Sequence, residues 1–213
     1  IGQALAALPA VETAVVVVDA VAGVQLGTRR LFHAAGEAGL ARMIIVNRID
    51  QNPDGLGALY EQLRAELGRT LHCINLPCKR ASDVIDCFDH DAGDSDFGSV
   101  AAVHQEMLES SVEIDDAEME KYLSGETIDL AELRACFVRA MSMGHVVPVL
   151  FASARTGAGI EDILHIIAEE CPSPLGGRPR RLVKDGEVFE VPCDVDKPFL
   201  AHVFSVTADP QLG

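Results

Sequence analysis

The chain has 213 residues and a formal net charge of −16, with 17 basic against 33 acidic side chains. This balance argues against nonspecific binding to nucleic-acid backbones, which requires a basic surface. The six cysteines form no CxxC pair, which favours reduced thiols in a cytoplasmic protein. No apolar run reaches the roughly 18 residues that a membrane span requires, so we expect no membrane partner.

Strand and helix signals alternate along the first third of the chain. The continuous apolar run TAVVVVDA at 13–20 is typical of a parallel strand covered on both faces. Apolar residues at helical spacing follow at 31–38, and MIIVN at 43–47 is a second buried strand. One apolar stripe predicts a helix over 56–67.

The same alternation returns near residue 145. HVVPVLFASA at 145–154 predicts a third strand, and a helix follows whose apolar stripe is Ile160, Ile163, Leu164 and Ile167. Strands that alternate with helices in this way predict a doubly wound α/β sheet.

The interval between these two parts, about 69–144, is too long and too patterned for a loop. We expect an inserted α+β subdomain there, with a strand at 71–78 and helices capped by Asp115 and Asp129. The acidic segment at 86–98 lacks the Gly and Glu spacing of a calcium loop, so we expect a solvated loop there and no metal.

The C-terminal part of the chain differs in composition from the rest. Residues 175–198 are rich in Gly, Pro and charge, as in a linker, and FLAHVFSVT at 199–207 predicts a strand. Because the chain begins at Ile1 rather than Met, we expect a fragment of a longer protein.

Polar side chains follow the second strand, where RMIIV continues into Asn47, Arg48 and Asp50. Ligands of doubly wound sheets bind beyond the carboxyl ends of the strands. An Asp carboxylate accepts two hydrogen bonds from the ring N–H and amino group of guanine, a pair that adenine lacks. The Asn amide would hold the base edge and the Arg side chain would lie over the ring. The alternative is a polar loop with Asn as a cap.

A second short motif ends the third strand, at Ser153 and Ala154. The Ala154 N–H would donate to the guanine carbonyl oxygen while the Ser153 hydroxyl braces the loop. A small-residue turn before a helix is the alternative for this motif alone. Both motifs at neighbouring strand ends, in this chain order, favour a guanine site.

These motifs stand in a longer matching context. The run AVVVVDAVAGVQLGTRRLFHAAGEAGLARMIIVNRID resembles the translational GTPases, in which a valine-rich strand, an A-x-x-G-V-Q turn and an N-K-x-D motif follow one another. Elongation factor G and its elongation-factor-G-like relatives fit best. MEKYLSGE within the insertion, ILHIIAEECPSP after FASA, and KPFLAHVFSVTADPQLG at the end support this resemblance, which covers essentially the whole chain.

The resemblance implies a partial P-loop GTPase-type sheet. Residues 1–178 would be the C-terminal part of the GTP-binding domain, and 179–213 a linker and the first strand of β-barrel domain II. It also implies a cytoplasmic translation factor whose acidic insertion contacts the ribosomal stalk. GTP or GDP, with magnesium in the parent protein, would be the cofactor. The residues that would hold the base are Asn47, Arg48, Asp50, Ser153 and Ala154.

Several departures from the family pattern qualify these expectations. Arg48 stands where the family has Lys, the flanks of FASARTG differ, and the insertion is shorter, so an elongation-factor-G-like paralogue is favoured. The chain has no Gly-rich loop that ends in Lys and Ser/Thr, and Ile1 aligns just after the family's Asp-x-x-Gly turn. We therefore expect a GTPase parent, but no catalytic residue, no GTP hydrolysis and at most weak GDP binding in this fragment.

Two further expectations concern partners. The strand at 14–19 would present an unpaired apolar edge, so the fragment would self-associate through it or through FLAHVFSV at 199–206. A degenerate, non-hydrolysing protein-interaction module is the alternative to a ribosomal GTPase. A release-factor or ribosome-protection relative is a third possibility.

Overall fold

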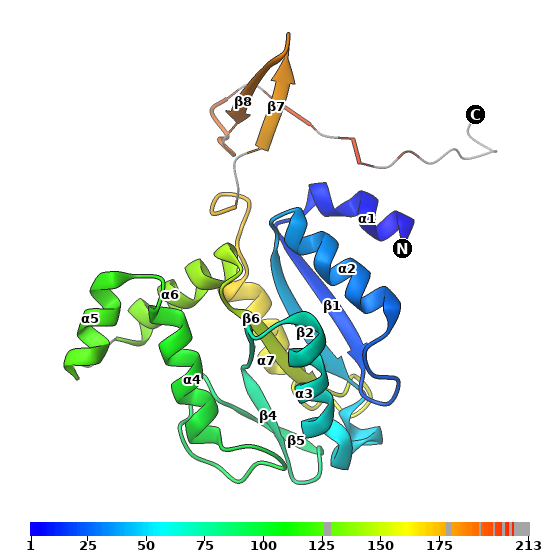
Figure 1. Cartoon of the computed structure of the whole chain (residues 1–213), viewed down its shortest axis with the longest axis vertical. Coiled ribbons are helices and arrows are strands. Elements are labelled where there is room, and N and C mark those ends of the chain that lie inside the picture. Colours follow the sequence, from blue (N-terminus) through cyan, green and yellow to red (C-terminus); the bar gives the residue numbers. More distant parts are fainter. Residues whose placement is uncertain are drawn as a thin grey trace.

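A four-stranded parallel sheet forms the centre of the computed structural model (Figure 1). The strand order is β1–β2–β6–β3, so strands distant in sequence are neighbours in the sheet. This confirms the predicted α/β class. The structure describes residues 1–125, 129–177, 180–191, 193–197, 199–201, 203–204 and 206. The sheet strands are β1 (Thr13–Asp19), β2 (Ala41–Asn47), β3 (Leu71–Cys73) and β6 (Val147–Ala152).

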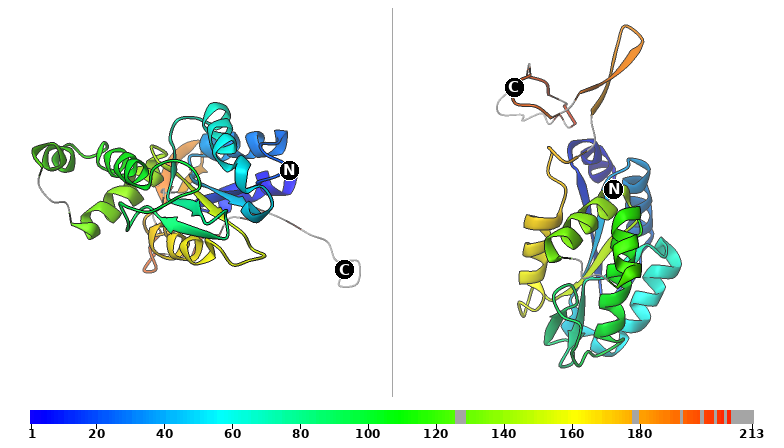
Figure 2. Two further views of the ribbon diagram at one scale, coloured as in Figure 1. Left: turned by 90° about the horizontal axis from the view of Figure 1, so that it is seen from below. Right: turned by 90° about the vertical axis from the view of Figure 1, so that its left-hand side faces the viewer.

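Helices cover the two faces of the sheet (Figure 2). One face packs against α2 (Leu26–Glu37) and α3 (Leu56–Leu67), and the other against α6 (Leu130–Met143), α7 (Ile160–His165) and the π-helix η4 (Ile166–Glu170). The remaining helices and strands are α1 (Gly2–Ala7), η1 (Leu8–Ala10), η2 (Ile49–Gln51), η3 (Pro53–Gly55), β4 (Asn75–Cys78), β5 (Asp83–Asp86), α4 (Val100–Val112), α5 (Asp116–Ser124), β7 (Arg180–Lys184) and β8 (Glu187–Val191).

Alternating strand residues build two cores, because successive side chains point to opposite faces. Val46 and Phe151 pack in the first core with the buried stripe of α3, as predicted. Met43 and Leu150 pack in the second core with α6 and η4. Both faces are thus covered, which explains the continuous apolar runs of β2 and β6.

The interval 69–144 divides between the sheet and separate elements. β3 pairs with β6, so these residues belong to the main sheet, whereas β4 and β5 form a separate antiparallel ribbon. Helix α4 was not predicted, although Ser99 caps it by accepting the N–H of Ala102. Asp115 caps α5 as predicted, but Asp129 precedes α6 without a side-chain capping bond.

The expected stripe of the last helix is partly wrong. Ile163 and Ile166 are the buried residues, while Leu164 is 62% and Ile167 45% exposed. The helix ends in a π-helical turn, in which the Cys171 N–H bonds the Ile166 carbonyl at 3.0 Å. The buried face runs through Ile163, Ile166 and Glu170 at ordinary helical spacing, so it is turned away from Leu164 and Ile167.

The segment expected to be a linker contains a β-hairpin, β7–β8. Its two-residue turn is Asp185–Gly186, and both residues have positive φ, 54° and 86°. An Asp-Gly pair between alternating residues is a strong hairpin signal, because this turn matches the twist of the strands. The strand expected at 199–207 is not formed in its described residues, and His202, Ser205 and Thr207 lie outside them.

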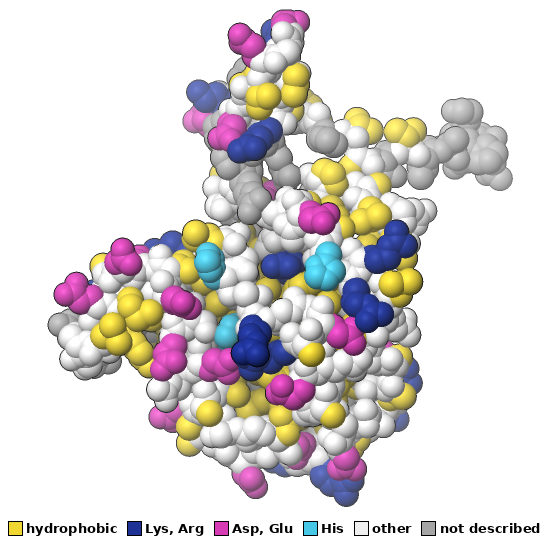
Figure 3. All heavy atoms as spheres, viewed as in Figure 1, with side chains coloured by type: hydrophobic (Ala, Val, Ile, Leu, Met, Phe, Trp, Pro, Cys, Tyr) yellow, Lys and Arg dark blue, Asp and Glu magenta, His cyan; other side chains and the backbone are white. Residues whose placement is uncertain are grey.

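Two surface features bear on partners. In the described part of the chain β1 pairs only with β2, and its Val15 and Val17 are 41% and 60% exposed. The expected coverage of this strand on both faces is therefore wrong, since the face of β1 that carries these two valines is open. Figure 3 shows acidic side chains over α4 and α5, where the exposed acids are Glu109, Glu113, Asp116 and Glu120. No helix of the described residues is both long and apolar enough to cross a membrane.

One buried histidine predicts a pH dependence of stability. Burial lowers the pKa of His72, an effect that the Glu106 carboxylate opposes. The unfolded chain therefore takes up this proton first, and stability is lost as pH falls through the ordinary value of 6.5. We expect His72→Asn to flatten the decline of the unfolding free energy between about pH 7 and 5, measured by urea denaturation. Equal flattening by His33→Asn, at an exposed position, would contradict this.

Candidate functional site

The predicted site residues meet at the carboxyl edge of the sheet. Asn47 ends β2 and is the register partner of Ala152, which ends the neighbouring parallel strand β6. Asp50 lies in η2 directly after β2, and Ser153 follows β6. The sheet order therefore brings Asp50 and Ser153 into contact although 103 residues separate them in sequence.

The Asp50 carboxylate is the centre of this group. Its Oδ1 accepts the Ser153 hydroxyl at 2.6 Å, and its Oδ2 accepts Nε and Nη2 of Arg155 at 3.1 and 2.5 Å. The Ser153 hydroxyl and the Arg155 guanidinium hold the pKa of Asp50 below its ordinary value, against the opposing effect of burial. Asp50 is therefore ionised at neutral pH and can only accept hydrogen bonds.

The Asn47 amide joins the two loops. Its Oδ1 accepts the N–H of Arg48 at 2.8 Å and the N–H of Ala154 at 3.1 Å. The Ala154 N–H, expected to face a base, thus donates to Asn47 in this structure. The Ser153 hydroxyl also accepts the Thr156 N–H at 3.2 Å, which is the bracing contact expected of it.

Arg48 lies differently from the expectation. It has a left-handed backbone, with φ of 68°, and its guanidinium bonds Asp19 at 2.5 Å and also Gln51. The side chain thus ties the loop after β2 to the end of β1 instead of extending freely over a base. Asp19 also accepts the N–H groups of Val21 and Ala22, which lower the pKa of its carboxyl together with Arg48.

A buried amide positions the end of β6. Asn75 is fully buried, its Oδ1 accepts the Phe151 N–H at 2.7 Å, and its Nδ2 donates to the Phe151 carbonyl at 3.2 Å. The Asn75 amide therefore makes the two hydrogen bonds that the backbone of a neighbouring strand would make, at a point where β3 has already ended. A third bond, from Nδ2 to Asp162 at 2.7 Å, ties the same point to α7.

The turn after β6 depends on glycine. Gly159 has φ of 68°, and a Cβ there would overlap the Phe151 carbonyl oxygen. The turn is closed by the bond from the Ser153 N–H to the Ala158 carbonyl at 2.9 Å. The left-handed backbone of Gly159 and its close approach to the Phe151 carbonyl thus define the shape of the turn that holds Ser153.

Sequence reasoning missed Arg155 as a partner of Asp50. The sequence gives little signal for this contact, because a long side chain on a loop has many possible positions. The only clue is that Arg155 follows the predicted pair Ser153–Ala154 directly in sequence. A guanidinium at that position is chemically suited to bind a nearby carboxylate.

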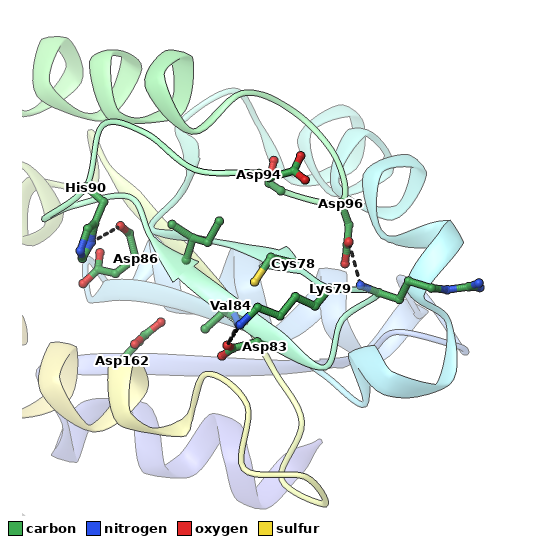
Figure 4. A pocket seen from close by; sticks show the side chains of 12 residues that line it. Cys78, Lys79, Asp83, Val84, Asp86, His90, Asp94, Asp96 and Asp162 are labelled. Carbon is green, nitrogen blue, oxygen red and sulfur yellow. Dashed lines mark hydrogen bonds and ion pairs between the residues drawn. The ribbon is translucent and has the colours of Figure 1, made fainter.

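A surface hollow lies beside the β4–β5 ribbon, apart from the Asp50 group (Figure 4). Several of its charged groups are already paired: Lys79 bonds Asp83 at 2.9 Å, and the Asp96 carboxylate accepts the N–H groups of Arg80 and Ala81. Lys79, Arg80 and Ala81 all have positive φ, and Asp96 holds this strained turn. These contacts organise the turn, so we assign no ligand to the hollow.

Comparison with known proteins identifies the family. Residues 1–173 match the family described as the elongation factor Tu GTP binding domain. The chain belongs to this family. Membership of a GTP-binding domain family is consistent with polar groups that gather at the carboxyl edge of its sheet, where ligands of such sheets bind.

Among solved structures, this GTP-binding domain chain is similar to a protein from Thermus thermophilus. The sequence identity is 34% and the TM-score 0.70, over 84% of this chain. The matched part is 30% of that protein. The similarity supports a partial GTPase-type α/β fold.

Proposed function

We propose that this chain supplies the guanine-reading part of a GTP-binding translation factor of the elongation factor G type. One observation carries the proposal: an ionised Asp50 and the Ser153–Ala154 turn meet at the carboxyl ends of two neighbouring strands. A carboxylate there accepts from the guanine ring N–H and amino group, which adenine cannot supply.

Each site residue has a part in this proposal. Asp50 reads the ring N–H and the amino group, and Ser153 holds its carboxylate in place. Ala154 offers its N–H to the guanine carbonyl oxygen, exchanging its bond with the Asn47 amide. Asn47 then contacts the base edge, and Arg48 fixes the loop through Asp19.

The proposal separates base recognition from hydrolysis. Asp50, Ser153 and the neighbouring groups fit the base, whereas the phosphate-binding loop and the magnesium ligands of the family would come from outside these 213 residues. GTP hydrolysis thus belongs to the longer parent protein. The fragment alone binds GDP weakly, because phosphates supply much of the affinity in this family, and does not hydrolyse GTP.

We assign the parent to the cytoplasm and to the ribosome, with the acidic insertion as the surface that meets the stalk. The exposed acids of α4 and α5 support this, since they suit a basic partner surface. Residues 1–178 would be the GTP-binding domain part, with an insertion that begins after β3 within the interval 69–144, and 179–213 the start of domain II. The edge of β1, which pairs only with β2 in the described part of the chain, and its exposed Val15 and Val17 support self-association of the fragment.

Titration of the chain with GDP and with ADP, followed by NMR, tests base recognition. We expect GDP to shift the amide signals of Arg48 and Ala154 and the side-chain signal of Asn47, with ADP much weaker. Fast exchange is expected because binding is weak. Equal effects of the two nucleotides, or shifts elsewhere only, would favour the alternative of a protein-interaction module.

A further inference from the structure

We propose that Arg155 is an internal competitor of guanine, which occupies the base-reading edge of Asp50 and sets both the affinity and the salt dependence of base binding. This inference rests on the proposed base-reading function. Arg155 is not among the residues that the sequence motifs predict to hold the base.

The geometry of the contact supports this role. Nε and Nη2 of Arg155 both donate to Oδ2 of Asp50, at 3.1 and 2.5 Å. Guanine presents the same chemical group, two N–H donors attached to one carbon, in its ring N–H and amino group. A guanidinium and a guanine edge thus offer the same pair of donors, and while Arg155 occupies Oδ2 the base cannot bond to that oxygen.

The exposure of the two partners makes the exchange possible. The Asp50 side chain is 8% exposed, and its other oxygen is held by Ser153. The Arg155 side chain is 71% exposed, and within the described chain its guanidinium bonds to Asp50 alone. Arg155 can therefore leave into solvent, while Asp50 stays in place for the base.

Two consequences follow for binding. Guanine binds only when the Asp50–Arg155 ion pair is broken. The dissociation constant for guanosine therefore rises as the fraction of molecules with a broken pair falls. An exposed ion pair of this kind is weak, which predicts about two- to fivefold tighter guanosine binding without it. Salt screens the pair, so added salt strengthens the binding of this uncharged nucleoside.

The test compares wild type, Arg155→Ala and Arg155→Lys, titrated with guanosine and adenosine at low and high salt. Neutral nucleosides exclude attraction between Arg155 and phosphate. Arg30→Ala, at an exposed position on α2, is the control that removes one positive charge elsewhere. The Nε–H signal of Arg155, assigned from its loss in the variants, reports the pair directly.

We expect Arg155→Ala to bind guanosine more tightly, with little salt dependence, and Arg155→Lys to lie between it and wild type. Saturating guanosine should move the Nε–H signal of wild type toward that of a solvated arginine. Unchanged or weaker guanosine binding in Arg155→Ala overturns the inference. The comparison of GDP with ADP decides the proposed function separately, so the two failures are distinguishable.

Discussion

Replacing Asp50 by asparagine should reverse the preference between guanine and xanthine. The Asn side-chain N–H₂ would face the ring N–H and amino group of guanine, leaving donors opposed to donors. Xanthine has a carbonyl in place of the amino group and can accept from Asn. We expect the ratio of GDP to XDP affinity to fall by about 100-fold, because buried polar groups that lose their partners discriminate strongly. Competition titrations with GDP and XDP measure this ratio.

A matched control separates this effect from loss of charge. Asp54→Asn removes one carboxylate four residues away, where the side chain is 87% exposed and contacts Arg80 at 3.4 Å. This variant should keep the wild-type order of nucleotides. If Asp50→Asn also keeps that order, Asp50 does not read the base.

The second large effect concerns the turn after β6. Gly159→Ala places a Cβ against the Phe151 carbonyl oxygen and keeps a left-handed backbone, so the chain must shift. We expect a loss of about 2–4 kcal/mol in the free energy of unfolding, from strain and steric overlap together. Urea denaturation measures it, and the displaced Ser153 should also weaken GDP binding.

Gly157→Ala is the control for this variant. Gly157 also has positive φ, 91°, but no atom lies within 4 Å of its added Cβ. Its cost is therefore backbone strain alone, about 1–2 kcal/mol. Equal losses in the two variants would show that contact with Phe151 does not matter.

Sequence patterns predicted those parts that depend on regular burial. The strands around Val46 and Phe151 were predictable because both faces of the sheet are covered, and chain order then implied that Asn47 and Ser153 are neighbours. The stripe containing Ile167 was mispredicted because apolar residues also occupy the exposed side of this helix, while the polar Glu170 is buried. The β7–β8 hairpin was missed although Asp185 and its glycine signal it.

The interactions of the site were less predictable than its location. Nothing in the pattern distinguishes an Arg48 that covers a base from an Arg48 bound to Asp19, because both use the same flexible side chain. The Asp50–Arg155 pair likewise depends on the conformation of two loops. Backbone periodicity fixes which strand ends meet, whereas side-chain torsions decide which charges pair.

Asn75 has a consequence for how the domain tolerates change. Its amide completes the hydrogen bonding of β6 at Phe151, so the chain can leave the sheet there and enter β4 without exposing the strand. We therefore expect changes in the ribbon and helices beyond this point to leave the turn after β6 in place. One buried side chain thus makes the geometry of this turn independent of the elements that follow Asn75 in the chain.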